Sequence, residues 1–145
     1  IDQVKNVNPE TNYRVRVCAR HPVYENHRIH IFQQLIRSFS KKNAEETLEI
    51  LGELMFQSQA AYTQIGLGNT ITDEIVSLVR EAGHTGGVYG ARITGGGSGG
   101  TVCVLAYGSK GKRTVKEIHE EMCRRAGHKL FLFTGSSNGA VTLKK

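Results

Sequence analysis

No stretch of this 145-residue chain is long and apolar enough to cross a bilayer, and no signal-peptide pattern opens it. Cysteine is scarce. The three cysteines, Cys18, Cys103 and Cys123, lie far apart, and an odd number without disulfide-framework spacing favours a reducing compartment. We therefore expect a cytoplasmic protein with no membrane partner. Internal repeats and long linkers are also lacking, so residues 1–145 are expected to form a single domain with a hydrophobic core.

Aromatic residues make up only 7% of the chain, and Phe131 and Phe133 are expected to face the core, so the sequence offers no stacking platform for nucleic-acid bases. The formal net charge is nevertheless +6. A solvated surface, a nucleotide phosphate or an acidic partner domain accounts for the basic residues as well as nucleic acid does. These residues occur in short groups, at Lys41–Lys42, Lys110–Arg113, Arg124–Arg125 and Lys144–Lys145.

The first part of the chain predicts a strand followed by helices. Alternating large and basic residues over 13–18 predict a strand, which Pro22 ends, and apolar residues at helical spacing predict a helix over 24–39. Asn43 with Glu46 forms a capping-box pattern that starts a longer helix, which two glycines end near residue 66.

The second part predicts alternating strands and helices. Thr70 with Asp73 is a further helix start, and Thr114 with Glu117 is another. The predicted elements are a third helix over 70–82, strands over 88–94 and 101–107, a fourth helix from 114 to about 126, and strands over 130–133 and near Val141. This order predicts an α+β protein, a two-layer sandwich with a mostly antiparallel sheet and helices on one face.

The six residues between the strands at 88–94 and 101–107 carry the strongest functional signal. Five of them are glycine, and each forgoes roughly 0.5–1 kcal/mol relative to alanine where the chain is ordered. We expect a role in ligand binding to compensate for this loss of stability. Glycines admit positive φ and bring backbone N–H groups into concavities that suit anionic oxygens, and a serine hydroxyl adds a donor. The candidate residues for binding a phosphorylated small molecule are Gly95, Gly96, Gly97, Ser98, Gly99 and Gly100.

Other readings of the glycine segment are weaker. The spacing of Gly95, Gly97 and Gly100 matches the dinucleotide-binding fingerprint, but that fingerprint requires a helix directly after the glycines, and a strand follows here. The phosphate-loop pattern that ends in Gly-Lys-Ser/Thr is absent. A merely flexible hairpin tip remains an alternative.

Histidines and one cysteine near the first predicted helix do not predict a metal site. Cys18, His21, His27 and His30 lack the spacing of zinc ligands. Glu25 and Arg28, three residues apart, suit an ordinary surface ion pair. For Asp73 the capping role is the preferred interpretation, with ligand contact as the alternative.

The segment Gly90–Thr101 resembles the third conserved motif of the GHMP small-molecule kinases, a family named after galactokinase, homoserine kinase, mevalonate kinase and phosphomevalonate kinase. Residues 20–28 resemble the arginine-histidine-glutamate-arginine stretch of the galactokinase-like and L-arabinokinase-like members. Residues 51–73 resemble the helix-loop-helix before their third motif, although Gln59 stands where a histidine is common. The resemblance covers nearly the whole chain and makes an interdomain or structural salt bridge an alternative role for Glu25 and Arg28.

The resemblance implies the C-terminal domain of an ATP-dependent sugar kinase, with a ferredoxin-like sandwich fold, that forms sugar 1-phosphate. It implies ATP and Mg²⁺ as cofactors and the residues Gly95 to Gly100 as binding residues, with Thr94, Gly68 and Asp73 as secondary candidates. The serine-rich ATP loop and the catalytic aspartate of the family belong to an N-terminal domain that this sequence does not match. That domain is the expected partner, no catalytic residue is assigned here, and the isolated chain is expected to have no kinase turnover.

Two other functions stay open. One is a stand-alone ferredoxin-like regulatory module that binds a phosphate-bearing effector through the glycine segment without chemistry. The other is a nucleic-acid-binding α+β domain, which the basic charge suggests and the low aromatic content disfavours.

Overall fold

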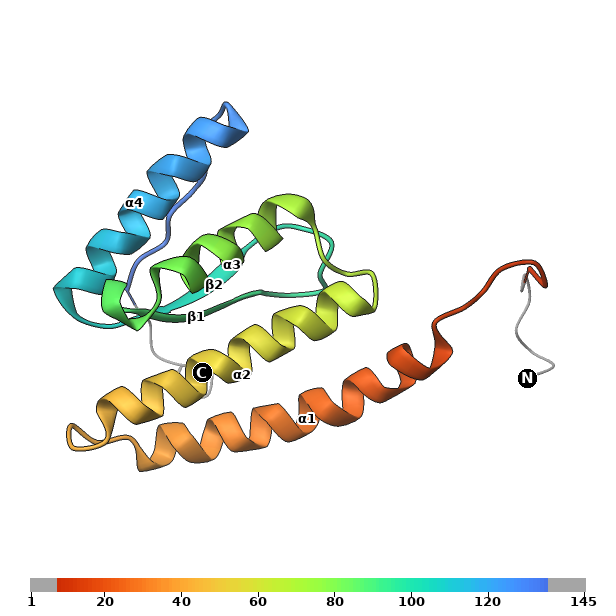
Figure 1. Ribbon diagram of the computed structural model, residues 1–145, viewed down its shortest axis with the longest axis horizontal. Coiled ribbons are helices and arrows are strands. Elements are labelled where there is room, and N and C mark those ends of the chain that lie inside the picture. Colours follow the sequence, from red (N-terminus) through yellow and green to blue (C-terminus); the bar gives the residue numbers. More distant parts are fainter. Residues whose placement is uncertain (1–7, 136–145) are drawn as a thin grey trace, which may run out of the picture.

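The computed structural model describes residues 8–135, which form four helices, one short 3₁₀ turn and two strands (Figure 1). None of the helices in this described part is long and apolar enough to cross a membrane. The mixed composition confirms the α+β class, and the sheet of the described residues has two antiparallel strands. In chain order the elements are α1 (Val15–Ser38), α2 (Ala44–Gln64), α3 (Thr70–Ala82), η1 (His84–Gly86), β1 (Val88–Ile93), β2 (Val102–Ala106) and α4 (Gly108–Ala126).

The β1–β2 hairpin carries the centre of the core. Ala91 pairs with Val104 and Ile93 with Val102, so alternate residues of both strands share one face. The register shifts between Val88 and Gly90, and Val88 and Ala91 pack in one cluster with apolar side chains of α2, α3 and α4. The buried members of this cluster are Phe56, Val76, Val79, Val88 and Ala91. The hairpin is therefore clamped by helices, which fixes the position of the turn at its end.

The predicted strand over 13–18 is wrong, because α1 begins at Val15 and continues through Pro22 to Ser38. Val17, His21, Tyr24 and Arg28 all line the cleft between α1 and α2. Their spacing of four, three and four residues is helical, so contact with α2 extends the helical period through the segment. Six alternating residues were too few to distinguish a strand from this helix.

The start of α2 is confirmed, but its predicted capping box does not form. The Oδ1 atom of Asn43 instead accepts hydrogen bonds from the backbone N–H and the hydroxyl of Ser40, both at 2.8 Å. The predicted cap of α3 is also displaced by one residue. Asn69 is the N-cap, and its side chain accepts the N–H of Ile71, which leaves Asp73 available for other partners.

Helix α4 begins six residues before the predicted start at Thr114. Thr114 lies within the helix, and its hydroxyl donates to the carbonyl of Gly86 at 2.8 Å instead of capping. The end of the helix is confirmed, since Gly127 follows Ala126 with a left-handed backbone.

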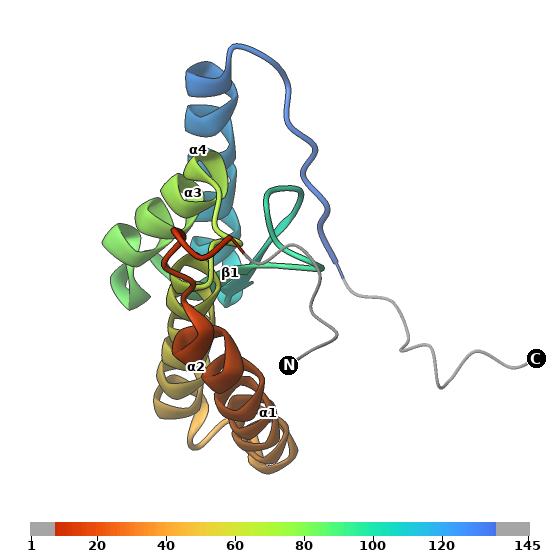
Figure 2. The ribbon, with the colours of Figure 1, turned by 90° about the vertical axis from the view of Figure 1, so that its right-hand side faces the viewer.

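Beyond α4 the predicted strand over 130–133 is wrong. The chain turns back beside α4 (Figures 1 and 2), where the N–H of Leu130 donates to the sulfur of Cys123 at 3.3 Å and its carbonyl lies 3.0 Å from Nε2 of His119. These contacts occupy the backbone groups that a strand ladder would use. Phe131 and Phe133 are 85% and 80% exposed, so they do not face the core. The predicted strand near Val141 lies outside the described residues.

Helix α2 lies in direct backbone contact with β1. A Cβ atom on Gly52 would lie 1.9 Å from the carbonyl oxygen of Tyr89, and one on Gly90 would lie 2.4 Å from the Cα atom of Gly52. Only glycine at both positions permits this approach. The contact sets how α2 lies along the strand that leads into the glycine segment.

Gly52→Ala tests this contact, because the contact determines whether the substitution raises or lowers the free energy of unfolding. In an ordinary helix the change would stabilise by about 1 kcal/mol, because alanine has the higher helix propensity. Here we expect a loss of about 1–3 kcal/mol, since the added methyl group forces α2 away from β1. Urea unfolding followed by circular dichroism measures the difference, and a stabilised variant would contradict the contact.

Candidate functional site

The glycine-rich turn between β1 and β2 has a defined conformation. Its base is closed by Thr94, whose N–H and hydroxyl both donate to the carbonyl of Thr101, at 2.8 and 3.2 Å. Within the turn the backbone adopts positive φ at Ser98 (63°) and at four glycines. Such angles are open to glycine and costly for most other residues. These glycines are Gly95 (72°), Gly97 (88°), Gly99 (119°) and Gly100 (99°).

The turn offers backbone donors that the described residues do not use. Ser98 N–H donates to the carbonyl of Leu67 at 2.7 Å. Within residues 8–135, the five glycine N–H groups of the turn donate to no protein acceptor. A Cβ atom built on Gly95, Gly96 or Gly100 would meet nothing within 4 Å, so the space beside them is open. Unpaired amides beside open space suit an anionic oxygen.

The turn is docked on the connection between α2 and α3, and both lie at the same end of the molecule (Figure 1). A Cβ atom on Gly97 would lie 2.6 Å from Cβ of Leu67, so the two backbones are in close contact. The hydroxyl of Tyr62 donates to the carbonyl of Gly95 at 3.4 Å, a long hydrogen bond. These contacts disfavour the interpretation of the turn as a free hairpin tip.

Gln59 joins three elements beneath the turn. Its side chain is 5% exposed, its Oε1 accepts the N–H of Ile93 at 2.7 Å, and its Nε2 donates to Oδ1 of Asp73 at 2.6 Å. The hydroxyl of Thr63 donates to the same oxygen at 3.3 Å. An amide side chain carries both an acceptor and donors, which lets it bridge a backbone N–H and a carboxylate. Gln59 thereby ties the end of β1 to α2 and α3.

The secondary candidates lie near the turn, but their contacts in the described residues are structural. Asp73 is not a helix cap, since Asn69 takes that role, and its carboxylate binds Gln59 and Thr63. Gly68 packs so closely that a Cβ atom would lie 2.8 Å from the hydroxyl of Thr63 and 3.0 Å from Oδ2 of Asp73. Thr94 closes the base of the turn.

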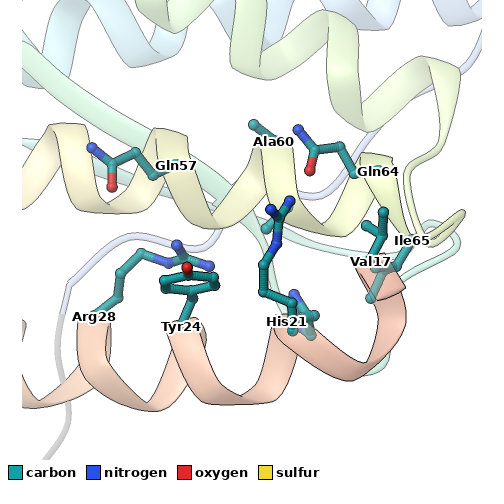
Figure 3. Close-up of a pocket in the computed structure, with 10 residues that line it drawn as sticks. Val17, His21, Tyr24, Arg28, Gln57, Ala60, Gln64 and Ile65 are labelled. Atoms are coloured by element: carbon teal, nitrogen blue, oxygen red, sulfur yellow. The ribbon is translucent and has the colours of Figure 1, made fainter. Parts of the chain in front are cut away.

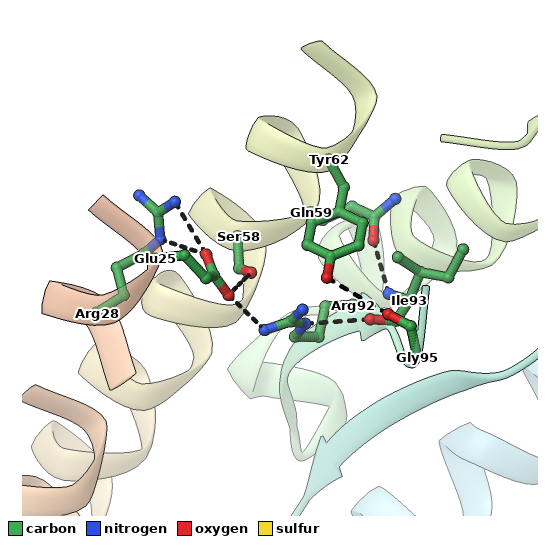
Figure 4. A network of polar contacts seen from close by, with 8 residues as sticks. All are labelled: Glu25, Arg28, Ser58, Gln59, Tyr62, Arg92, Ile93 and Gly95. Atoms are coloured by element: carbon green, nitrogen blue, oxygen red, sulfur yellow. Dashed lines mark hydrogen bonds and ion pairs between the residues drawn. The ribbon is translucent and has the colours of Figure 1, made fainter. Parts of the chain in front are cut away.

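Glu25 is the centre of a second polar network, drawn in Figure 4. Its Oε1 accepts from the hydroxyl of Ser58 at 2.5 Å and from Nη1 of Arg92 at 2.7 Å. Its Oε2 accepts from Nε of Arg28 at 3.0 Å. The side chains of Glu25 and Arg28 are only 13% and 15% exposed. The Glu25–Arg28 pair is therefore a largely buried pair within α1 and not an ordinary surface pair, and Glu25 joins α1 to α2 through Ser58 and to β1 through Arg92.

The partners of Glu25 favour its charged form. Burial alone would raise the pKa of the carboxyl group, but hydrogen bonds from Ser58 and Arg28 and the charges of Arg92 and Arg28 outweigh it. Together they hold the pKa of Glu25 below its ordinary value of 4.5. Glu25 is thus an anion at neutral pH.

Arg92 connects this network with the glycine-rich turn. Its Nε donates to the carbonyl of Ile93 at 3.1 Å, and its guanidinium carbon lies 5.2 Å from the centre of the Tyr62 ring. A cation at that distance is attracted to the ring face. Arg92 therefore contacts both Ile93, at the start of the turn, and Tyr62, which supports Gly95.

Besides a hollow lined by Glu25, Ser58 and Arg92, two further hollows among the described residues adjoin the site. One of about 370 Å³ opens between α1 and α2, and its lining includes Arg20, Arg28, Gln57 and Gln64. Figure 3 shows Arg28 of α1 opposite Gln57 of α2. This hollow shares no lining with the glycine-rich turn, although His21 on its wall meets Tyr62 edge to face, with ring centres 5.1 Å apart. The other, of about 670 Å³, lies among α3, α4, β2 and residues 128–133 and includes Gly99 and Gly100.

Comparison with known proteins agrees with the motif at the turn. A family profile described as "GHMP kinases C terminal" matches residues 34–129. The chain belongs to the GHMP kinases. It is 38% identical to an L-arabinokinase of Arabidopsis thaliana over 96% of this chain and 14% of that protein. It is 31% identical to a galactokinase of Clostridium tetani over 83% of this chain and 29% of that protein. A galactokinase of Lactococcus lactis is 36% identical over 72% of this chain and 25% of that protein.

Sugar kinases of this family use ATP, with Mg²⁺ as its usual companion, so both are candidate ligands at the turn. The turn fits phosphate groups, because it holds unpaired amides beside open space. The residues near it do not fit a metal ion. Within residues 8–135 no three His, Cys, Asp or Glu side chains are grouped as metal ligands. The nearby carboxylates of Glu25 and Asp73 are already hydrogen-bonded to side chains.

In this GHMP kinase domain the glycine-rich turn is evident from the sequence, but most of the side chains that hold the turn in place are not. Tyr62 belongs to the apolar face of α2 and lies beside the turn, where its hydroxyl reaches the carbonyl of Gly95. Gln59 was noted only as a departure from the family pattern, yet it is the buried bridge. Arg92, in a strand of otherwise uncharged residues, was the one available signal of an ion pair with Glu25.

Gly97→Ala and Gly96→Ala are a matched pair that tests the docking of the turn. At Gly97 the methyl group meets Leu67 and the φ of 88° disfavours it, so we expect a loss of about 1–3 kcal/mol of stability. At Gly96 the space is open and φ is not positive, so we expect a change within about 0.5 kcal/mol. Thermal unfolding measures both, and equal effects would contradict the docking.

Glu25→Gln tests the ion network through pH. Because folding lowers the pKa of Glu25, its stabilising contribution is fully present above the ordinary value of 4.5 and is lost as the pH falls through the lower folded value. Wild type should exceed Glu25→Gln in unfolding free energy by a constant amount from about pH 7 to about pH 5, and the gap should narrow below.

Urea unfolding at several pH values measures this gap. Glu53→Gln is the matched control, because Glu53 is 55% exposed and lies 3.9 Å from Arg80 in a loose pair. Its substitution should change little at any pH. A gap for Glu25→Gln that stays the same in acid would contradict the network.

Proposed function

We propose that this chain is the C-terminal part of an ATP-dependent sugar kinase that transfers the γ-phosphate to a monosaccharide and yields a sugar 1-phosphate. The observation that carries the proposal is the glycine-rich turn, residues 94–101, docked on the α2–α3 connection with five glycine amides that have no protein acceptor in the described residues. The family supports kinase chemistry, and relatives named L-arabinokinase and galactokinase support a sugar acceptor.

The turn would position phosphate without performing acid–base chemistry. Phosphoryl transfer depends mainly on positioning and on stabilising charge at the phosphate oxygens. Backbone amides supply both, because they are fixed donors that need no proton transfer. Ser98 N–H is already used by Leu67, so the glycine amides, with the Ser98 hydroxyl, are the proposed phosphate donors.

The remaining machinery is proposed to lie in other parts of a longer protein. The chain spans only 14% and 29% of the lengths of the arabinokinase and of the clostridial galactokinase that it matches. The carboxylates beside the turn are occupied by hydrogen bonds, so they supply neither a free base nor a metal site. We therefore expect the isolated chain, residues 1–145, to show no sugar kinase turnover. The proposed kinase is expected to act in the cytoplasm.

L-Arabinose is the first acceptor to test. The arabinokinase aligns over 96% of the chain at 38% identity, whereas the clostridial galactokinase aligns over 83% at 31%. Galactose is the second acceptor for the same reason. Both sugars present an anomeric hydroxyl, which is the proposed phosphate acceptor.

The test uses the complete reading frame that contains this chain, with ATP, Mg²⁺ and a panel of monosaccharides. We expect sugar 1-phosphate with arabinose or galactose and no product from the matched methyl glycosides, whose anomeric oxygen is blocked. Residues 1–145 alone are assayed in parallel and should be inactive. ATP binding without phosphorylation of any sugar would contradict the kinase and favour a regulatory module, and phosphorylation of a methyl glycoside would contradict the 1-phosphate product.

A further inference from the structure

The polar contacts around Arg92 form a continuous tether from α1 to the glycine-rich turn, seen in Figure 4. Glu25 on α1 holds Arg92 on β1 at 2.7 Å. Arg92 in turn holds the carbonyl of Ile93 at 3.1 Å and lies over Tyr62 of α2, whose hydroxyl reaches the carbonyl of Gly95. The three side chains Glu25, Arg92 and Tyr62 thus come from three different elements, and the last contact is made to the turn itself.

The geometry of this tether restricts Arg92 to one orientation. Its Nη1 is fixed by the Glu25 carboxylate and its Nε by the Ile93 carbonyl, so the planar guanidinium has two anchors at different nitrogens. Its side chain is 25% exposed, which limits alternative arrangements with water. Glu25 is itself held by Ser58 and Arg28, so it cannot follow Arg92 freely.

The tether reaches the turn at Gly95, between the hydrogen bonds of Thr94 at the base and the packing of Gly97 on Leu67. Gln59 holds the N–H of Ile93 before the turn, and Leu67 holds the N–H of Ser98 in its second half. Between these anchors lie Gly95, Gly96 and Gly97, and the one polar contact to them from the described residues is that from Tyr62. The carbonyl of Gly95 shares its peptide plane with the N–H of Gly96, so the orientation of the Gly96 amide depends on Tyr62 and on the guanidinium against its ring.

We propose that Arg92 is a positioning residue that, held by Glu25, fixes Tyr62 and thereby aims the first half of the glycine-rich turn at the phosphates of ATP. The identity of the ligand as ATP rests on the proposed function, whereas the contacts that make up the tether do not depend on it. Arg92 touches neither ATP nor sugar in it, so its substitution should alter how the nucleotide is held and leave sugar binding unchanged.

Arg80 provides a matched control. It also lies over an aromatic ring, with its guanidinium carbon 3.9 Å from the centre of Phe56, and pairs with Glu53 at 3.9 Å. It sits on α3, and no described contact joins it to the turn. Arg80→Gln thus removes the same kind of cation–ring contact from the same core without touching the tether.

The first measurement is hydrogen exchange by mass spectrometry on the complete protein without ligand, in the peptide that covers residues 91–101. Thr94 and Ser98 amides are bonded in this peptide. We expect their exchange to be several-fold faster in Arg92→Gln and Tyr62→Phe than in wild type, and unchanged in Arg80→Gln. Unchanged exchange in Arg92→Gln would overturn the tether whether or not the protein is a kinase.

The second measurement is steady-state kinetics with ATP and the accepted sugar. We expect Arg92→Gln to raise the KM for ATP about tenfold and to leave the KM for sugar within about twofold, with Arg92→Lys intermediate because it keeps the charge but loses the Nε bond. Equal increases in both KM values, or the same increase in Arg80→Gln, would overturn the positioning role. A wild-type protein without turnover but with the expected exchange pattern would refute the proposed function and retain the tether.

Discussion

The close contact between α2 and β1 at Gly52 and Gly90 is the constraint on which the site depends. From this contact the two elements reach their next connection, Gln59 with Ile93, seven helical residues and three strand residues later. Seven residues of helix rise about 10.5 Å and three of strand about 10 Å, so the helix and the strand stay in step. Tyr62 then reaches Gly95 one helical turn further on. The two missing Cβ atoms thus set the register for the contacts of Gln59 with Ile93 and of Tyr62 with Gly95.

Two sets of polar contacts near the α2–β1 contact join different helices to β1. Gln59 is buried and neutral, and it satisfies the last N–H of β1 while it holds Asp73 of α3. Glu25 and Arg92 are charged and less buried, and they attach α1 to the same strand. The low exposure of Glu25 makes its ionised state depend on both arginines, so the ion network acts as one unit. Helix α1 has no fully buried residue, and these ion pairs are therefore a main part of its attachment.

Much of the local structure could be predicted because its signals lie within short segments. The strands that flank the turn, the helices α2 and α3 and the glycine end of α4 follow from apolar period and glycine position. The strand expected at 13–18 failed because α2 extends the helical period there, and the strand expected at 130–133 failed because Leu130 bonds to α4. The turn was predicted from its glycines, whereas Gln59 and Arg92 act through partners more than 30 residues away, which no local pattern reveals.

We expect the docked glycine-rich turn to face the phosphates of ATP. A crystal structure of the complete protein with a non-hydrolysable ATP analogue and a sugar tests it most directly. We predict that amides of Gly95 and Gly96 donate to phosphate oxygens while Ser98 N–H keeps its bond to Leu67 and Arg92 keeps its bond to Glu25. Phosphates bound elsewhere, with the turn directed to solvent, would contradict it.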